Sequence, residues 1–255
     1  MTVDQAWLKE RVREFEASIL FLTRLRYRTA QPDSGAAIAR AAWAFPLAGV
    51  LVGLVGWVVY WLAYRAGLTF WPAAALSVAA TMALTGCLHE DGLADTADGF
   101  GGGDTRAQKL DIMRDSRIGV YGVCVLALSI IIRVSALASL GAPSLVFAAL
   151  IAAHGAARAV LPAFMYSVPP ARADGLSAGA GPPPLAGAAA AAILGVLILI
   201  LCLGFAHGLA ALILLAIGTA LLAWLSLSQI EGQTGDVLGA LEQAGEIIVL
   251  LVALS

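Results

Sequence analysis

The stretch from Leu185 to Ser228 reads LAGAAAAAILGVLILILCLGFAHGLAALILLAIGTALLAWLSLS and contains no Asp, Glu, Lys or Arg. About 20 apolar residues cross a bilayer as a helix, so we expect two crossings here, at 185–205 and 208–228. The whole chain shares this character, since 60% of its 255 residues are apolar and only 13% are charged. Soluble domains carry about a quarter charged residues. The sequence therefore predicts an integral membrane protein.

Apolar stretches of similar length occur along most of the chain. Together they give seven candidate transmembrane helices, at 44–64, 68–88, 118–140, 143–163, 185–205, 208–228 and 237–254. No internal repeat or linker divides them. We therefore predict an all-α fold, a polytopic membrane helix bundle that forms one domain over residues 1–255.

Residues 1–43 precede the first candidate span and have a different pattern. Apolar side chains recur there every three or four residues, at Leu8, Val12, Phe15, Ile19 and Leu22. This spacing predicts an amphipathic helix. It fits a helix lying in the membrane interface and fits equally well a helix packed against the other spans.

The basic residues predict the orientation of the bundle. They gather before the first span and between the second and third, at Lys9, Arg11, Arg13, Arg24, Arg26, Arg28, Arg40, Arg106, Lys109, Arg114 and Arg117. Such segments belong to the cytoplasmic side, so the loops at 89–117, 164–184 and 229–236 all fall on the cytoplasmic face. The net charge of −2 gives no basic field for nucleic acid.

The 89–117 loop concentrates negative charge. Seven of the seventeen acidic residues lie within it, at Glu90, Asp91, Asp95, Asp98, Asp104, Asp111 and Asp115. On a helix, Asp91, Asp95 and Asp98 share one stripe. A second helix-like stretch carries Asp111 and Asp115 at the same spacing, and the intervening triple glycine would let the two stripes face each other.

Carboxylates without His or Cys partners favour Mg²⁺ or Mn²⁺, which often bridge protein carboxylates to substrate phosphates. We therefore expect a cytoplasmic metal site and a phosphorylated substrate, with Arg114 and Arg117 binding phosphate oxygens or neutralising nearby acids. A plain solvated acidic face is the simpler alternative. His89 is a candidate general base, although a histidine at a membrane boundary is more often structural.

Five ionisable residues fall inside apolar stretches, where charges are costly and often functional. They are Arg133, His154, Arg158, Glu242 and Glu246. Glu242 and Glu246 share a helix face, and we expect Arg158 to be their partner. A brace between helices and a contact with substrate are equally good interpretations. Thr234 and Asp236 lie just before this face, at its cytoplasmic end.

Several blocks, in order, carry a family resemblance: FLTRL at 21–25, AFPLAGVLVG at 44–53, HEDGLADTADGFGG at 89–102, IMRDSRIGVYG at 112–122 and GQTGDVLGALEQAGE at 232–246. They resemble the cobalamin synthase family of adenosylcobinamide-GDP ribazoletransferases. This resemblance implies a Mg²⁺-dependent enzyme, with Mn²⁺ as a second candidate, in the bacterial cytoplasmic (inner) membrane. It would join adenosylcobinamide-GDP to α-ribazole or α-ribazole 5′-phosphate and release GMP. A homo-oligomer or a complex with other enzymes of cobalamin biosynthesis is compatible with it.

The blocks and the charge patterns together give three sets of expected site residues. The catalytic set is Asp91, Asp95, Asp98, Asp115 and His89. The metal set is Asp91, Asp95, Asp98, Asp111 and Glu90. The substrate-binding set is Arg114, Arg117, Arg158, Arg24, Thr234, Asp236, Glu242 and Glu246.

Two other functions compete with this interpretation. A membrane CDP-alcohol phosphotransferase also uses aspartates at the end of a span, but Asp95 stands where its motif has arginine. An ion-coupled transporter would use the charges inside the spans and would leave the acidic loop unexplained.

Overall fold

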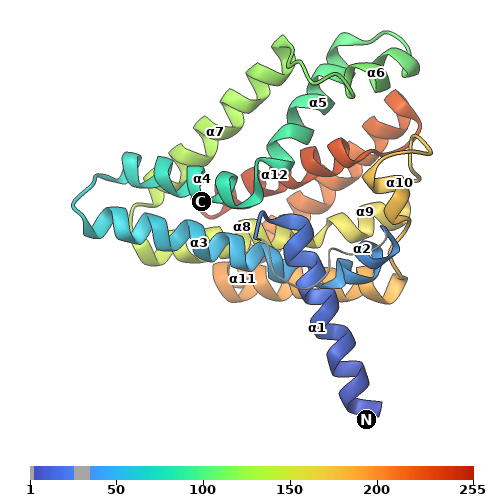
Figure 1. Cartoon of the computed structure of the whole chain (residues 1–255). Helices are drawn as coiled ribbons and strands as arrows, with labels where there is room; N and C mark the ends of the chain where they lie inside the picture. The colour runs from blue at the N-terminus through green and yellow to red at the C-terminus, as the bar shows by residue number, and fades with distance from the viewer. Residues whose placement is uncertain (1–2, 26–34) are drawn as a thin grey trace.

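The computed structural model describes residues 3–25 and 35–255 and is a bundle of helices (Figure 1). Arg26 and Arg28 lie outside the described residues. The elements are α1 Val3–Leu22, α2 Gly35–Ala41, the 3₁₀ turn η1 Ala42–Ala44, α3 Phe45–Arg65, α4 Phe70–Thr85, α5 Leu88–Gly102, α6 Arg106–Ile112, α7 Val120–Leu140, α8 Pro143–Ala159, α9 Leu161–Ser167, α10 Leu176–Ala180, α11 Leu185–Ile230 and α12 Gly235–Val252. The described part contains no strand beyond an isolated bridge between Pro170 and Gln233. The all-α prediction is confirmed.

The long element α11 consists of two helices. Gly204 interrupts it with φ 77° and ψ 172°, a conformation outside the helical region. Residues of both parts, including Leu199 and Leu212, line a shared cavity, so the chain folds back on itself. The break at Gly204 lies two residues before the gap predicted between the spans 185–205 and 208–228.

Four stretches of the described chain are long and apolar enough to cross a membrane: Gly35–Arg65, Val120–Leu140, Pro143–Ser167 and Leu185–Ile230. A fifth would be the pair α4 and α5, which meet at an angle of 89°. The predicted span 68–88 is therefore cut short at Thr85. α12 carries three acidic residues, and the count of seven spans stays a prediction.

Large apolar side chains cover the outside of α11. Leu201 is 82% exposed, Phe205 71% and Trp224 67%. Exposing this surface to water would be unfavourable, because removing apolar area from water stabilises a protein by about 25 cal/mol per Å². Contact with lipid chains removes the surface from water, so the exposed side chains agree with the membrane character expected from composition.

The helix α1 forms as predicted, and its N-terminal end projects from the bundle (Figure 1). Of the predicted apolar face, Leu8 and Val12 are exposed, whereas Leu22 is buried against the core. Glu14 accepts a hydrogen bond from Trp43 Nε1 at 2.6 Å. The C-terminal part of α1 is thus packed, and the interfacial position of its free end stays a prediction.

Glycine brings α5 and α12 into close backbone contact. A Cβ atom at Gly92 would lie 2.7 Å from the carbonyl oxygen of Asp236, and one at Gly239 would lie 3.0 Å from that of His89. Side chains at these two positions would push the helices apart. The two glycines therefore hold the acidic helix α5 against the N-terminal end of α12.

Candidate functional site

The acidic helix α5 begins immediately after a sharp bend in the chain. Gly86 and Cys87 both have left-handed backbone conformations, with φ 68° and 59°. α5 is a regular helix over Leu88–Gly102, which confirms the helical spacing predicted for its aspartates. Asp91 is exposed, Asp95 is half-buried and Asp98 is buried.

Asp98 points toward the start of α7. Its carboxylate accepts hydrogen bonds from the backbone N–H groups of Gly119 at 2.7 Å and Gly122 at 2.9 Å. These are N–H groups that the first turn of a helix cannot satisfy internally. The predicted stripe of three carboxylates is therefore divided, with Asp98 bound to backbone and Asp91 and Asp95 left for other partners.

Asp91 and Asp95 line a cavity of about 430 Å³ between α5 and the segment that follows α6. Glu90, Arg114 and Asp115 also contribute to its wall, and we call this space the acidic cavity. Among the described residues, no hydrogen bond or salt bridge reaches the carboxylate of Asp91 or Asp95. The acidic cavity thus brings together five of the predicted site residues, and two of them, Asp91 and Asp95, have no cationic partner within hydrogen-bond or salt-bridge distance in the described chain.

The segment after α5 differs in part from the prediction. α6 ends at Ile112, so Asp111 lies on the helix and Asp115 beyond it, and the two do not form one helical stripe. Met113 and the residues after it form turns and bends up to the start of α7. Asp111 is exposed and is not among the residues that line the acidic cavity.

The two predicted phosphate-binding arginines are paired with acids. Arg117 donates hydrogen bonds to Asp115, including one from Nε at 3.0 Å, and this interaction lowers the pKa of Asp115 to about 2. Arg114 Nη2 lies 2.7 Å from both carboxylate oxygens of Asp174. Both arginines are exposed, so these pairs can exchange for a phosphate at low cost.

Asp236 lies at the N-terminal end of α12, next to α5. Burial raises its pKa, although the hydroxyl of Thr234 donates to its carboxylate at 3.0 Å. Thr234 also accepts from the backbone N–H of Val237 and so caps the helix. Arg172 lies 3.7 Å from Asp236. The sequence prediction missed Arg172 and Asp174, and the only available signal was that Arg172 is the sole base in the 164–184 loop.

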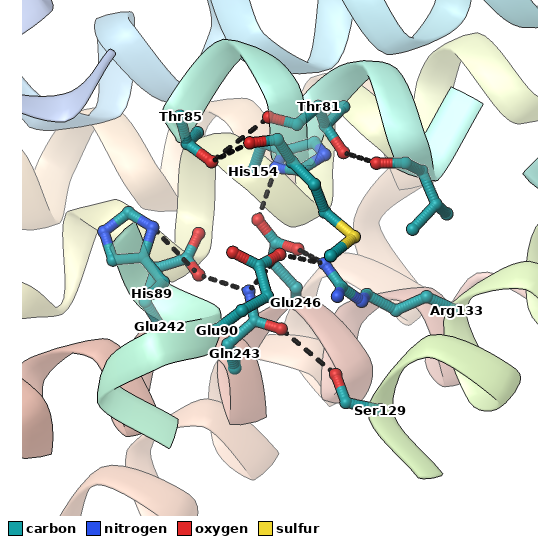
Figure 2. Close-up of polar contacts among 12 residues, drawn as sticks. Thr81, Thr85, His89, Glu90, Ser129, Arg133, His154, Glu242, Gln243 and Glu246 are labelled. Atoms are coloured by element: carbon teal, nitrogen blue, oxygen red, sulfur yellow. Dashed lines mark hydrogen bonds and ion pairs between the residues drawn. The ribbon is translucent and has the colours of Figure 1, made fainter. Parts of the chain in front are cut away.

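Eight polar side chains form what we call the buried charge cluster, deep between α5, α7, α8 and α12, and Figure 2 labels all of them except Arg158. Its members are His89, Glu90, Arg133, His154, Arg158, Glu242, Gln243 and Glu246. Each is at most 5% exposed. Four helices therefore meet at one set of charges.

The contacts within the buried charge cluster link all four helices. Arg133 Nη1 lies 3.0 Å from Glu90 and 3.2 Å from Glu246. Arg158 pairs with both Glu242 and Glu246, which confirms the predicted partnership.

His89 also belongs to this network. Its Nδ1 atom lies 3.4 Å from a carboxylate oxygen of Glu242 (Figure 2). Arg158, Glu242 and Glu246 are each at most 1% exposed. The geometry is that of a brace between helices, and a direct contact of these three residues with substrate stays a prediction.

Arg24 lies at the bend between α4 and α5. Its backbone N–H donates to the carbonyl oxygen of Leu84 at 2.7 Å, and its side chain passes over Gly86. A Cβ atom at Gly86 would collide with this side chain. Arg24 is exposed, so the FLTRL block places its only charge beside the start of the acidic helix.

Comparison with known proteins gives a consistent result. The family model described as Cobalamin-5-phosphate synthase, CobS, matches residues 14–254. An adenosylcobinamide-GDP ribazoletransferase of Bradyrhizobium diazoefficiens is 58% identical over 233 residues, which cover 91% of this chain and 90% of the relative. A protein of the same name from Mesorhizobium japonicum is 56% identical over 92% of this chain and 90% of its own length.

More distant relatives carry the same name, as in Azorhizobium caulinodans, where the identity is 45% over 87% of this chain and 85% of the relative. No solved structure matches the chain. The family match spans α5, α12 and the segment that follows α6, and these elements build the site. The chain belongs to the CobS family of cobalamin-5-phosphate synthases.

Proposed function

We propose that this protein is an adenosylcobinamide-GDP ribazoletransferase, which joins adenosylcobinamide-GDP to α-ribazole or its 5′-phosphate and releases GMP. The observation that carries the proposal is the acidic cavity, in which Asp91 and Asp95 have no salt bridge to any residue that the structure describes and Arg114 shares the wall. Diphosphate transfer needs such a combination, because both the substrate and the protein contribute negative charge that cations must balance.

The donors in the acidic cavity suit Mg²⁺, with Mn²⁺ as a second candidate. Asp91 and Asp95 offer hard oxygen atoms on successive turns of one helix, and neither carboxylate has a hydrogen bond or salt bridge within the described chain. When bound there, a divalent cation would neutralise charge on the diphosphate oxygens. Of the other expected ligands, Asp98 binds the start of α7, Glu90 pairs with Arg133, and Asp111 lies outside the cavity.

The proposed reaction is an in-line displacement at phosphorus. A hydroxyl oxygen of α-ribazole forms a bond to the phosphorus attached to cobinamide, and the bond from that phosphorus to the bridging oxygen breaks. GMP leaves with the bridging oxygen, and the hydroxyl proton passes to water. Arg114 would bind phosphate oxygens after releasing Asp174, and Arg117 would keep Asp115 charged and in place. Positioning and electrostatics are the main demands of such a step.

The buried charge cluster supports the site indirectly. His89 and Glu90 directly precede Asp91 on α5, and their contacts with Glu242 and Arg133 fix the helix to α12 and α7. We infer that Arg158, Glu242 and Glu246 set the position of Asp91 relative to Asp236. In this role His89 orients α5, which makes it a positioning residue.

We further propose that the protein resides in the bacterial cytoplasmic membrane with the acidic cavity on the cytoplasmic face. The support is the charge pattern, since the loop 89–117 is rich in arginine and lysine. Gly67 precedes α4 and Asp104 follows α5, so the two residues lie at opposite ends of this pair of helices. In intact cells, an impermeant thiol reagent should label a cysteine introduced at Gly67 and should not label one introduced at Asp104. The reverse labelling pattern would overturn the assignment.

The reaction itself is tested with purified protein in detergent, supplied with adenosylcobinamide-GDP and α-ribazole. Cobalamin and GMP should form in equal amounts with Mg²⁺ and should not form with a chelator present. A protein that makes no GMP but moves an ion across proteoliposomes would be a transporter. Product formation in the presence of the chelator would contradict the proposed metal dependence and would leave the proposed transferase reaction standing.

A further inference from the structure

A second cavity lies on the other side of Asp91 and has a different chemical character. Its volume is about 170 Å³, and it is enclosed by parts of six helices and the start of α12. Its wall is largely apolar, with Phe21, Ile38, Phe45, Leu161 and Met165 as the large side chains. We call it the apolar cavity.

Four polar side chains of the described chain line the apolar cavity, namely Asp91, Asp236, Ser177 and His89. Asp91 also lines the acidic cavity. The remaining polar side chains of the wall are already engaged. Ser177 donates to Gln233 at 2.7 Å, and His89 lies 3.4 Å from Glu242. Among the described residues, the wall away from Asp91 and Asp236 therefore offers few free polar atoms to a ligand.

We propose that the apolar cavity binds the bicyclic aromatic base of α-ribazole, with the ribose pointing toward Asp91. This inference rests on the proposed function. The ligand and the cavity have the same polarity pattern, because α-ribazole has a methylated apolar base at one end and hydroxyl groups at the other. The rings of Phe21 and Phe45 stack with centroids 5.9 Å apart, so the wall already favours aromatic packing.

The size of the apolar cavity selects among the substrate parts. An apolar cavity of about 150 Å³ is enough to bind benzene, and the 170 Å³ found here suits a base whose sugar continues outward. A corrin ring is far larger. The base of α-ribazole has one free ring nitrogen, whereas guanine has several ring nitrogens, an exocyclic oxygen and an amino group. Guanine would therefore bury more polar atoms without partners along the apolar wall, which is costly. The position beside Asp91 places an attacking hydroxyl next to the acidic cavity, where the diphosphate is expected.

Filling the apolar cavity provides the first test. Ala180 is a buried wall residue on α10, and Ala180→Leu should raise KM for α-ribazole about tenfold or more. KM for adenosylcobinamide-GDP should stay unchanged. The matched control is Ala163→Leu, which enters a different cavity, on the far side of α9, and should alter neither constant.

Enlarging the cavity provides a second test that does not depend on the first variant. Met165→Ala should raise kcat/KM for an α-riboside with a fused tricyclic base relative to α-ribazole by about tenfold. Unchanged base ranking in Met165→Ala, or an Ala180→Leu effect confined to adenosylcobinamide-GDP, would overturn the assignment of the cavity. Failure of the unmodified protein to convert any riboside would instead refute the proposed function, so the two failures are distinguishable.

Discussion

Asp91 and Asp98 have the same side chain on the same helix, and the structure gives them different tasks. Asp91 is exposed between two cavities, while Asp98 accepts hydrogen bonds from the backbone of Gly119 and Gly122. Helical spacing in the sequence places both on one stripe but does not reveal where α7 begins relative to α5. The different roles of Asp91 and Asp98 therefore follow from the contact between Asp98 and the start of α7.

Replacing Asp91 should remove activity without unfolding the protein. We expect Asp91→Asn to lower turnover by roughly a hundredfold or more, because a lost charge partner at a transferring phosphate costs at least this much. GMP release from purified protein measures the effect. Asp104→Asn, an exposed aspartate outside the cavity, is the control, and equal activity of the two variants would contradict the role of Asp91.

Replacing Asp98 should mainly change stability. Asp98→Ala leaves the N–H groups of Gly119 and Gly122 without an acceptor, and loss of such a cap costs about 1–2 kcal/mol. Thermal unfolding in detergent should show a lower midpoint for Asp98→Ala than for Asp91→Ala. Identical midpoints for these two variants would show that the capping contact contributes nothing.

At the scale of elements, the contact between α5 and α12 determines the site. The basic residues predicted that the loops 89–117, 164–184 and 229–236 lie on one face of the membrane, which stays a prediction, and the structure brings α5 into contact with the N-terminal end of α12. The sequence did not predict how closely they meet, because Gly92 and Gly239 matter only once both helices are in place. Likewise, α1, α2, α9 and α10 contribute to the apolar cavity through contacts that no local pattern encodes.

The close approach of α5 and α12 can be tested at Gly92. Gly92→Ala places a methyl group 2.7 Å from the backbone of Asp236, and overpacking of this kind costs about 1–3 kcal/mol. We expect lower thermal stability and reduced turnover together. Gly102→Ala lies on the same helix with its nearest neighbour at 3.5 Å, so it should leave both properties intact. A stable and active Gly92→Ala variant would refute the close-contact argument.

At the scale of the whole molecule, the buried charge cluster connects helices from distant parts of the sequence. The sequence identified five of its seven ionisable members inside spans and named Arg158 as the partner of Glu242 and Glu246. It assigned Glu90 to the metal set, whereas the structure pairs Glu90 with Arg133. It did not identify the linking role of Gln243. Burial of these side chains follows only from the assembled bundle.

Removing one charge from the buried charge cluster should destabilise the entire bundle. Arg158→Met leaves Glu242 and Glu246 without their shared cation, and breaking a buried pair costs about 3–5 kcal/mol. Thermal unfolding and the yield of folded protein in detergent measure this. Arg117→Met removes an exposed arginine and should change the midpoint little. Equal midpoints for the two variants would exclude a bracing role.

The sequence separation within this cluster has a consequence for biogenesis. Arg158 lies 88 residues before Glu246, and ribosomes add roughly 5–20 residues each second. The interval between synthesis of Arg158 on α8 and synthesis of Glu246 on α12 is therefore roughly 4–18 seconds. Until then Glu90 is the one carboxylate of the buried charge cluster that has been synthesised, and it pairs with Arg133. The last helix therefore supplies both carboxylates with which Arg158 pairs.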